Sequence, residues 1–178
     1  MKDLKIAIVG FGEIGQAFAQ LLINKGDDIK KRFDTRLSVV CIATRSRGNV
    51  VDAWGIDLHK ALDAMKEKGS LEGVLGYETN RTPMELLESV DYDIMVELTP
   101  MELHKSEISY GYIKAALKRG KHAITANKAT VAWRYKELKE LAIKKGAMFM
   151  YEATVMAGTP LSNMKRNALD MCDIQEIK

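Results

Sequence analysis

Short apolar runs alternate along the chain with longer stretches in which apolar residues recur every three or four positions. The apolar runs predict buried strands at 5–9, 37–43, 94–98, 123–125 and 147–151. The recurring pattern predicts helices at 13–25, 57–68, 83–89, 107–118 and 134–144. Asp57 and Thr82 are the expected N-caps of two of these helices, and glycines mark the expected ends of three, at positions 69, 120 and 146.

This alternation of strands and helices is typical of an α/β fold. Neighbouring parallel strands must be joined by a crossover connection, and a helix is the usual crossover. The sequence therefore predicts a doubly wound, mostly parallel sheet with helices on both faces. With 178 residues, of which 47% are hydrophobic, the chain can bury one sizeable core, so we expect one main compact domain.

Charge and cysteine content narrow the class of protein. The 27 basic and 24 acidic side chains give a formal net charge of only +3, so the composition predicts no binding to nucleic acid or to an anionic membrane. The two cysteines, Cys41 and Cys172, lack the spacing of a disulfide framework or a zinc site, which favours a reducing, cytoplasmic setting. The first apolar run, Ile6 to Val9, is too short for a signal peptide or a membrane span.

The first predicted strand leads into a glycine-rich turn, Gly10-Phe11-Gly12-Glu13-Ile14-Gly15, which fits the G-x-G-x-x-G fingerprint of dinucleotide binding. In this pattern Gly10 permits a tight turn, Gly12 lets the backbone approach a pyrophosphate, and Gly15 allows close packing of helix on strand. Free N–H groups at the start of the following helix favour the phosphates. An ordinary tight turn is the alternative. The position between a strand and an amphipathic helix favours a Rossmann dinucleotide site, which would include Phe11 and Ile14.

The second predicted strand indicates which dinucleotide is bound. NAD-preferring sites usually end this strand in Asp or Glu, which holds the ribose 2′-hydroxyl, whereas this chain reads Ala43-Thr44-Arg45-Ser46-Arg47. Arg45 suits the extra 2′-phosphate of NADP, and Ser46 adds a hydroxyl donor. We therefore expect NADP as cofactor, with NAD as the other option. The alternative is that these arginines are solvated loop residues.

Two later strand ends lie on the same expected ligand side of the sheet. One carries Glu97-Leu98-Thr99-Pro100, and the next leads to Thr125-Ala126-Asn127-Lys128. Taken singly, Glu97 reads as a structural charge and Lys128 as a surface lysine or the first turn of a helix. Beside a nicotinamide, Lys128 becomes a candidate proton donor or acceptor for a carbonyl–alcohol interconversion.

These two motifs, together with Tyr151-Glu152-Ala153-Thr154-Val155-Met156-Ala157-Gly158-Thr159-Pro160, resemble the amino-terminal, nucleotide-binding half of homoserine dehydrogenase, in the same order and near the same spacing. The resemblance covers nearly the whole chain. It implies NAD(P)-dependent interconversion of L-homoserine and L-aspartate 4-semialdehyde, in threonine, methionine and isoleucine biosynthesis. It also implies that Lys128 is an active-site lysine that reaches the cofactor, and that Thr99 and Pro100 lie beside the nicotinamide.

The same resemblance implies a monovalent-cation site, with Na⁺ as the expected ion. Its ligands would be Glu152 and the backbone carbonyls of Val155, Ala157 and Thr159. A carboxylate followed by carbonyls on a turning segment is a hard oxygen cage, which suits sodium rather than zinc. The alternative is a buried Glu152 that pairs with a local cation such as Lys128 or Arg166.

The resemblance also divides the chain. We expect residues 1–160 to form the dinucleotide-binding domain and residues 161–178 to begin a substrate and dimerisation domain that is cut short. The amino-acid substrate would then be gripped by groups outside this sequence, in a homo-oligomer or on a second chain. Two alternatives remain open: a non-catalytic dinucleotide-binding module, and another Rossmann reductase such as aspartate dehydrogenase, against which the segments 125–128 and 151–160 argue.

Overall fold

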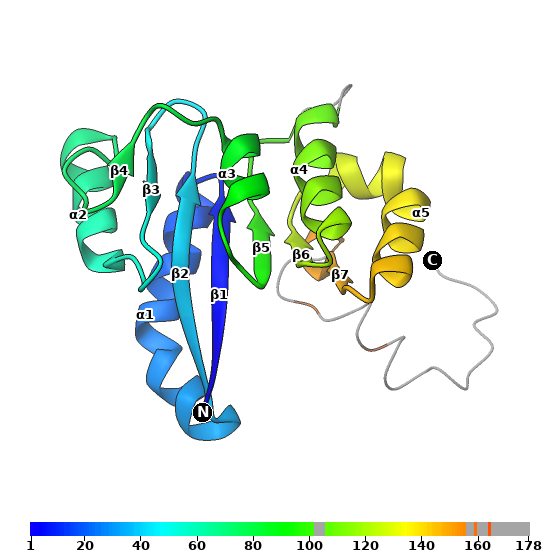
Figure 1. The fold of residues 1–178 in the computed structure, drawn as a ribbon, viewed down its shortest axis with the longest axis horizontal. Coiled ribbons are helices and arrows are strands. Elements are labelled where there is room, and N and C mark those ends of the chain that lie inside the picture. Colours follow the sequence, from blue (N-terminus) through cyan, green and yellow to red (C-terminus); the bar gives the residue numbers. More distant parts are fainter. Residues whose placement is uncertain (102–105, 156–158, 160–163, 165–178) are drawn as a thin grey trace.

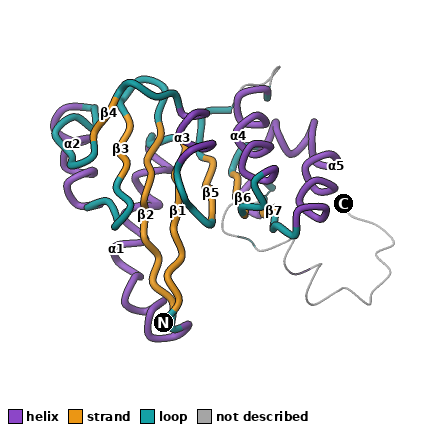
Figure 2. The backbone as a smooth tube through the Cα atoms, in the orientation of Figure 1, coloured by secondary structure: helices purple, strands orange, loops and turns teal. Residues whose placement is uncertain are grey.

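The computed structural model describes residues 1–101, 106–155, 159 and 164 (Figures 1 and 2). Its strands and helices alternate as the sequence predicts, except that a short strand, Asn49–Val51, directly follows the strand Thr35–Ala43. In chain order the elements are β1 (Lys2–Val9), α1 (Glu13–Phe33), β2 (Thr35–Ala43), β3 (Asn49–Val51), α2 (Leu58–Lys68), β4 (Tyr77–Glu78), α3 (Pro83–Ser89), β5 (Ile94–Glu97), α4 (Glu107–Lys118), β6 (His122–Thr125), α5 (Lys128–Lys145), β7 (Phe149–Met150) and a 3₁₀ turn, η1 (Glu152–Thr154).

The strands form one seven-stranded sheet in the order β4-β3-β2-β1-β5-β6-β7. Five neighbouring strands of the sheet are parallel, in the order β2-β1-β5-β6-β7. Strands β3 and β4 add an antiparallel edge beside β2. The predicted mostly parallel α/β fold is therefore confirmed. Because β1 pairs with β2 on one side and with β5 on the other, the direction of winding reverses between β1 and β5.

Each face of the sheet packs against its own set of helices. On β1, Ala7 and Val9 join a core with residues of α3, α4 and α5, whereas Ile6 and Ile8 join a second core with residues of α1 and α2. Alternate residues of a strand point to opposite faces, so the unbroken apolar run of β1 is buried on both sides. Figure 1 shows α4 and α5 side by side, and they contact each other directly.

Several element boundaries differ from the predicted ones. Helix α1 continues to Phe33 because Gly26 has a helical backbone with open space around it, and the helix ends only where Asp34 turns left-handed, with φ 48°. Helix α5 begins at Lys128 rather than at Arg134 because the Asn127 side chain accepts a hydrogen bond from the Thr130 amide and caps it there. Strand β7 is shorter than its apolar run, and β3 and β4 were not predicted.

Among the described residues no helix is both long and apolar enough to cross a membrane. The expected start of a second domain at 161–178 lies outside the described residues, apart from Met164.

Candidate functional site

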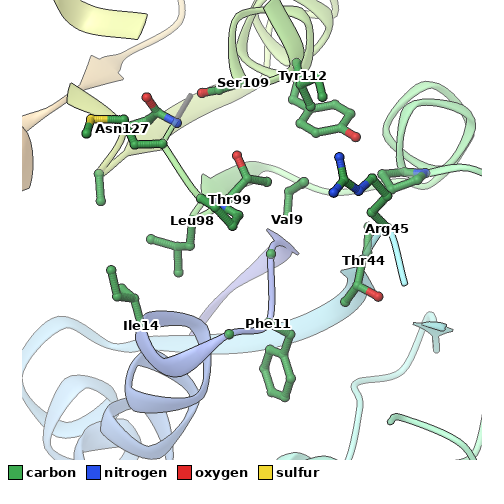
Figure 3. Close-up of a pocket in the computed structure, with 18 of the residues that line it drawn as sticks. Val9, Phe11, Ile14, Thr44, Arg45, Leu98, Thr99, Ser109, Tyr112 and Asn127 are labelled. Carbon is green, nitrogen blue, oxygen red and sulfur yellow. The ribbon is translucent and has the colours of Figure 1, made fainter. Parts of the chain in front are cut away.

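A cavity of about 570 Å³ opens at the carboxyl ends of the parallel strands, where the winding reverses. It is lined by the loops that follow β1, β2, β5 and β6, together with the start of α4. In Figure 3, Arg45 lies at one end of this pocket and Asn127 at the opposite end, with Thr99 between them. In open α/β sheets this is the place where ligands bind.

Three positions of the first loop are occupied by glycine, and the surroundings of each position differ. A Cβ on Gly10 would lie 2.6 Å from the carbonyl oxygen of Leu98, and Gly10 has φ +93°. A Cβ on Gly15 would lie 2.4 Å from the carbonyl oxygen of Gly10, so Gly15 lets α1 pack against the turn. A Cβ on Gly12 would meet nothing within 4 Å. Gly12 therefore faces open space in which a ligand has room to approach the backbone.

Two other predicted residues of this loop differ in their roles. Phe11 borders the pocket, but the residue is only 1% exposed and its side chain packs in the core with residues of α1 and α2. Ile14 is 60% exposed and lines the pocket from the first turn of α1. We infer that Phe11 anchors the turn while only its backbone is available to a ligand.

The loop after β2 is held rigidly by two buried side chains. The Thr44 hydroxyl donates to the carbonyl of Gly48 at 2.7 Å and accepts from the amide of Arg47 at 2.9 Å. Asn49 Oδ1 accepts from the amide of Thr44 at 2.8 Å. This network places Arg45 and Ser46, the residues predicted to bind the 2′-phosphate, at the pocket wall.

The arginines near this loop are not equivalent. Glu78 accepts two hydrogen bonds from the Arg81 guanidinium and raises the pKa of Arg81 above its ordinary value. Arg47 donates to the backbone carbonyl of Phe11 at 3.5 Å. Arg45 is exposed and makes no hydrogen bond or ion pair with any described residue. The Arg45 guanidinium therefore has no competing partner among the described residues, whereas that of Arg47, which also lines the pocket, has one.

The opposite end of the pocket gathers the residues of the two later motifs. Thr99, Pro100, Asn127 and Lys128 all line it, and Lys128 is exposed at the first position of α5. Glu97 lies just outside the lining, fully buried, and hydrogen-bonds to Thr99 and Thr125. The structure thus brings together two motifs that are almost thirty residues apart in sequence.

Helix α4 contributes pocket residues that the sequence did not reveal. Ser106, Ile108, Ser109 and Tyr112 line the cavity from its first two turns. The apolar pattern of α4 correctly indicates a helix, but which side of its start faces the ligand depends on how it packs over β5 and against α5. Local sequence carries no signal for that packing.

The predicted cation ligands are only partly described. Glu152 opens η1 and one of its carboxyl oxygens, Oε2, is buried. The amide of Val155 donates to the carbonyl of Glu152 at 3.5 Å, so the chain turns back on itself here. Thr159 is exposed, and Ala157 lies outside the described residues.

Comparison with known proteins agrees with this geometry. Residues 10–152 match the family model described as homoserine dehydrogenase, NAD binding domain. The chain belongs to the homoserine dehydrogenase family. The homoserine dehydrogenase of Methanocaldococcus jannaschii is 35% identical over 175 residues, which are 98% of this chain and 52% of that protein. A crystal structure of a homoserine dehydrogenase from Archaeoglobus fulgidus superposes with a TM-score of 0.80 at 34% identity, over 96% of this chain and 49% of that one.

The chain spans about half the length of the homoserine dehydrogenases that it matches. Its relatives differ in the dinucleotide that they are named for. A protein from Pseudomonas canavaninivorans, 30% identical over 95% of this chain and 48% of its own length, is named an NAD(+)-dependent homoserine dehydrogenase. A hyperthermophilic archaeal homoserine dehydrogenase whose structure is a complex with NADPH superposes with a TM-score of 0.80 at 31% identity, over 94% of this chain and 50% of that one.

The different surroundings of the glycines predict different outcomes for alanine substitutions. Gly12→Ala should cost about 1 kcal/mol or less of folding free energy, because its Cβ enters open space at a helix N-cap. It should nevertheless weaken dinucleotide binding about tenfold or more, because the methyl group occupies ligand space. Gly15→Ala should cost about 2 kcal/mol or more, because backbone must move. Denaturant titration and calorimetric binding measure the two effects separately.

Gly26→Ala is the matched control in the same helix. Its Cβ also meets nothing within 4 Å, but it lies far from the pocket lining. It should raise stability by up to about 1 kcal/mol and leave cofactor affinity unchanged. Unaltered dinucleotide affinity in Gly12→Ala would contradict the role assigned to Gly12.

Proposed function

We propose that the chain is the cofactor-binding half of an NAD(P)-dependent oxidoreductase that interconverts L-homoserine and L-aspartate 4-semialdehyde. The observation that carries this proposal is that one pocket joins the glycine turn after β1 to Asn127 and Lys128 after β6. A dinucleotide bound across the reversal point spans from the first two strands to the later ones. Its reactive ring then lies where an exposed lysine is available to a substrate.

The residues that would hold the cofactor divide along the pocket. The first turn of α1, which begins after Gly12, offers free backbone N–H groups to the pyrophosphate. Arg45 and Ser46 would hold a 2′-phosphate, which favours NADP over NAD. Thr99 and Pro100 would lie beside the nicotinamide. The nicotinamide supplies hydride transfer when it is bound, and the protein supplies position and electrostatics.

Lys128 would donate a proton to the substrate oxygen, or accept one from it in the reverse reaction. Its ammonium group is at the pocket, on the first residue of α5, and makes no ion pair with any described residue. An unpaired ammonium group can stabilise a developing alkoxide by charge and donate the proton that completes the alcohol. The groups that grip the amino-acid part of the substrate would come from the half of the family's length that this chain does not span, in the same or another polypeptide.

We propose a monovalent cation at the turn that begins with Glu152, held by its carboxylate and by the carbonyls of Val155, Ala157 and Thr159. The local backbone supports this, because η1 turns the chain back on itself directly after the Glu152 carboxylate, and a carboxylate followed by turning backbone carbonyls forms a hard oxygen cage. The ion would order the segment after β7 rather than take part in hydride transfer.

Removal of the Arg45 guanidinium should change cofactor preference. Arg45→Ala should weaken NADPH binding by about 10- to 150-fold, the equivalent of 1.5–3 kcal/mol for a charge-assisted phosphate contact. NADH affinity should change by less than about twofold, since NADH has no 2′-phosphate. Arg36→Ala is the matched control, because this arginine pairs with Asp3 outside the pocket lining. Equal affinities of the unmodified chain for NADPH and NADH in calorimetric titration would overturn the preference.

Removal of the Lys128 amine should affect chemistry and not stability. In a polypeptide that also carries a substrate-binding half of this family, Lys128→Ala should lower turnover of homoserine about a hundredfold or more. The melting temperature and cofactor affinity should stay nearly unchanged, because the side chain is exposed. Lys136→Ala, an exposed lysine of the same helix, should leave turnover unaltered. Preserved turnover with a lower melting temperature would make Lys128 a structural residue.

Occupancy of the cation site should appear in thermal stability. The melting temperature should be higher in sodium chloride than in choline chloride at equal ionic strength, because binding stabilises the folded state. Glu152→Gln should remove this difference, because it deletes the charged ligand. A sodium effect that persists in the variant would place the ion elsewhere.

A further inference from the structure

Glu97 is a fully buried carboxyl group that the proposed reaction does not use. It ends β5, next to the pocket, and it forms no ion pair with any described lysine or arginine. Burial of such a group is costly unless hydrogen-bond donors surround it. The hydrogen-bond donors around Glu97 therefore indicate which segments its carboxyl group holds in place.

The first oxygen of the carboxyl group holds the loop that follows β5. Glu97 Oε1 accepts from the backbone amide of Thr99 at 2.9 Å and from the Thr99 hydroxyl. These bonds fold residues 98 and 99 back over the end of their own strand. Thr99 lines the pocket, so its position depends on Glu97.

The second oxygen joins two other segments to the same point. Glu97 Oε2 accepts from the Ser109 hydroxyl of α4 at 2.7 Å and from the Thr125 hydroxyl of β6 at 2.6 Å. The Thr125 oxygen in turn accepts from the backbone amide of Asn127 at 2.9 Å. Through Thr125, Glu97 is thus connected to the residue that caps α5 and precedes Lys128.

The sheet itself does not need these bonds. The backbones of β5 and β6 already pair from Ile94 to Glu97, and the Ala126 amide donates to the Glu97 carbonyl at 3.3 Å. What the side chain adds is a fixed relation between three segments that each supply a pocket residue: Thr99, Ser109 and Asn127. Asn127 and Ser109 lie on the side of the pocket away from Arg45, and Thr99 lies between Asn127 and Arg45 (Figure 3).

We propose that Glu97 is a positioning residue that fixes the nicotinamide end of the pocket, and that it does so without touching the ligand. This inference rests on the proposed function, because it takes Arg45 as the site of the 2′-phosphate. The proposal has a specific consequence. Loss of the Glu97 hydrogen bonds should weaken binding of the nicotinamide half of the cofactor and leave binding of the adenosine half unchanged.

The test compares two ligands that share the adenosine end. NADPH fills both ends of the pocket, whereas adenosine 2′,5′-bisphosphate carries the 2′-phosphate but no nicotinamide. Glu97→Gln keeps the shape of the side chain but presents one acceptor oxygen in place of two. It should weaken NADPH binding about tenfold, because buried donors lose their acceptor, and change adenosine 2′,5′-bisphosphate affinity by less than about twofold.

A second variant makes the test independent of the folding of the first. Thr125→Val keeps Glu97 and the volume of the side chain but breaks the link to Asn127. It should shift the ratio of the two affinities in the same direction, by about threefold. Thr44→Val is the matched control at the other end of the pocket, because Thr44 orders the loop after β2 that carries Arg45. It should lower the affinity for both ligands by the same factor.

The outcomes separate the two proposals. If the unmodified chain binds neither ligand, the proposed function fails. If it binds both ligands, but Glu97→Gln and Thr125→Val leave the ratio of the two affinities unchanged, the positioning role of Glu97 is wrong. This holds whether the variants weaken the binding of both ligands equally or of neither. Should Glu97→Gln fail to fold, the ratio measured for Thr125→Val decides alone.

Discussion

The close approach of two loops at the point where the sheet reverses its winding is the constraint on which the site depends. Gly10 lies so near the carbonyl of Leu98 that a side chain at position 10 would overlap the backbone. This contact brings the turn after β1 against the loop after β5, and the amide of Leu98 donates to the carbonyl of Val9 at 2.7 Å. The carboxyl ends of the two central strands are thereby joined, and a single pocket spans them rather than two separate grooves.

Each end of this pocket is ordered by a buried threonine at the end of a strand. Thr44 follows β2 and Thr125 ends β6, and each hydroxyl accepts a hydrogen bond from a backbone amide two or three residues ahead. Each hydroxyl also donates to an oxygen, the carbonyl of Gly48 for Thr44 and the carboxylate of Glu97 for Thr125. A hydroxyl that both donates and accepts leaves its loop little freedom. The loops that would hold the cofactor are therefore preorganised, and binding needs to order few residues.

The parts of the structure that rest on local chemistry could be read from the sequence. The glycine turn is one, and the N-cap of α3 by Thr82 is another. Features that depend on distant contacts could not be read. The ring of Phe11 turns into the core because residues of α1 and α2 leave space for it there, and three-residue β3 is a strand only because it pairs with β2 and β4. The pocket-facing side of α4 likewise depends on packing that lies outside its own sequence.

The charge at the start of α5 runs against the usual preference of helices. Helices α1, α3 and α4 each carry a glutamate in the first turn, where a negative charge faces the positive end of the helix dipole. Helix α5 has none and begins with Lys128, a placement that costs about 0.3–1 kcal/mol at an exposed site. No described acidic side chain forms an ion pair with Lys128 to offset this cost. A local rule that is broken without structural compensation is expected at a functional site, and this one, at the rim of a ligand pocket, supports the role proposed for Lys128.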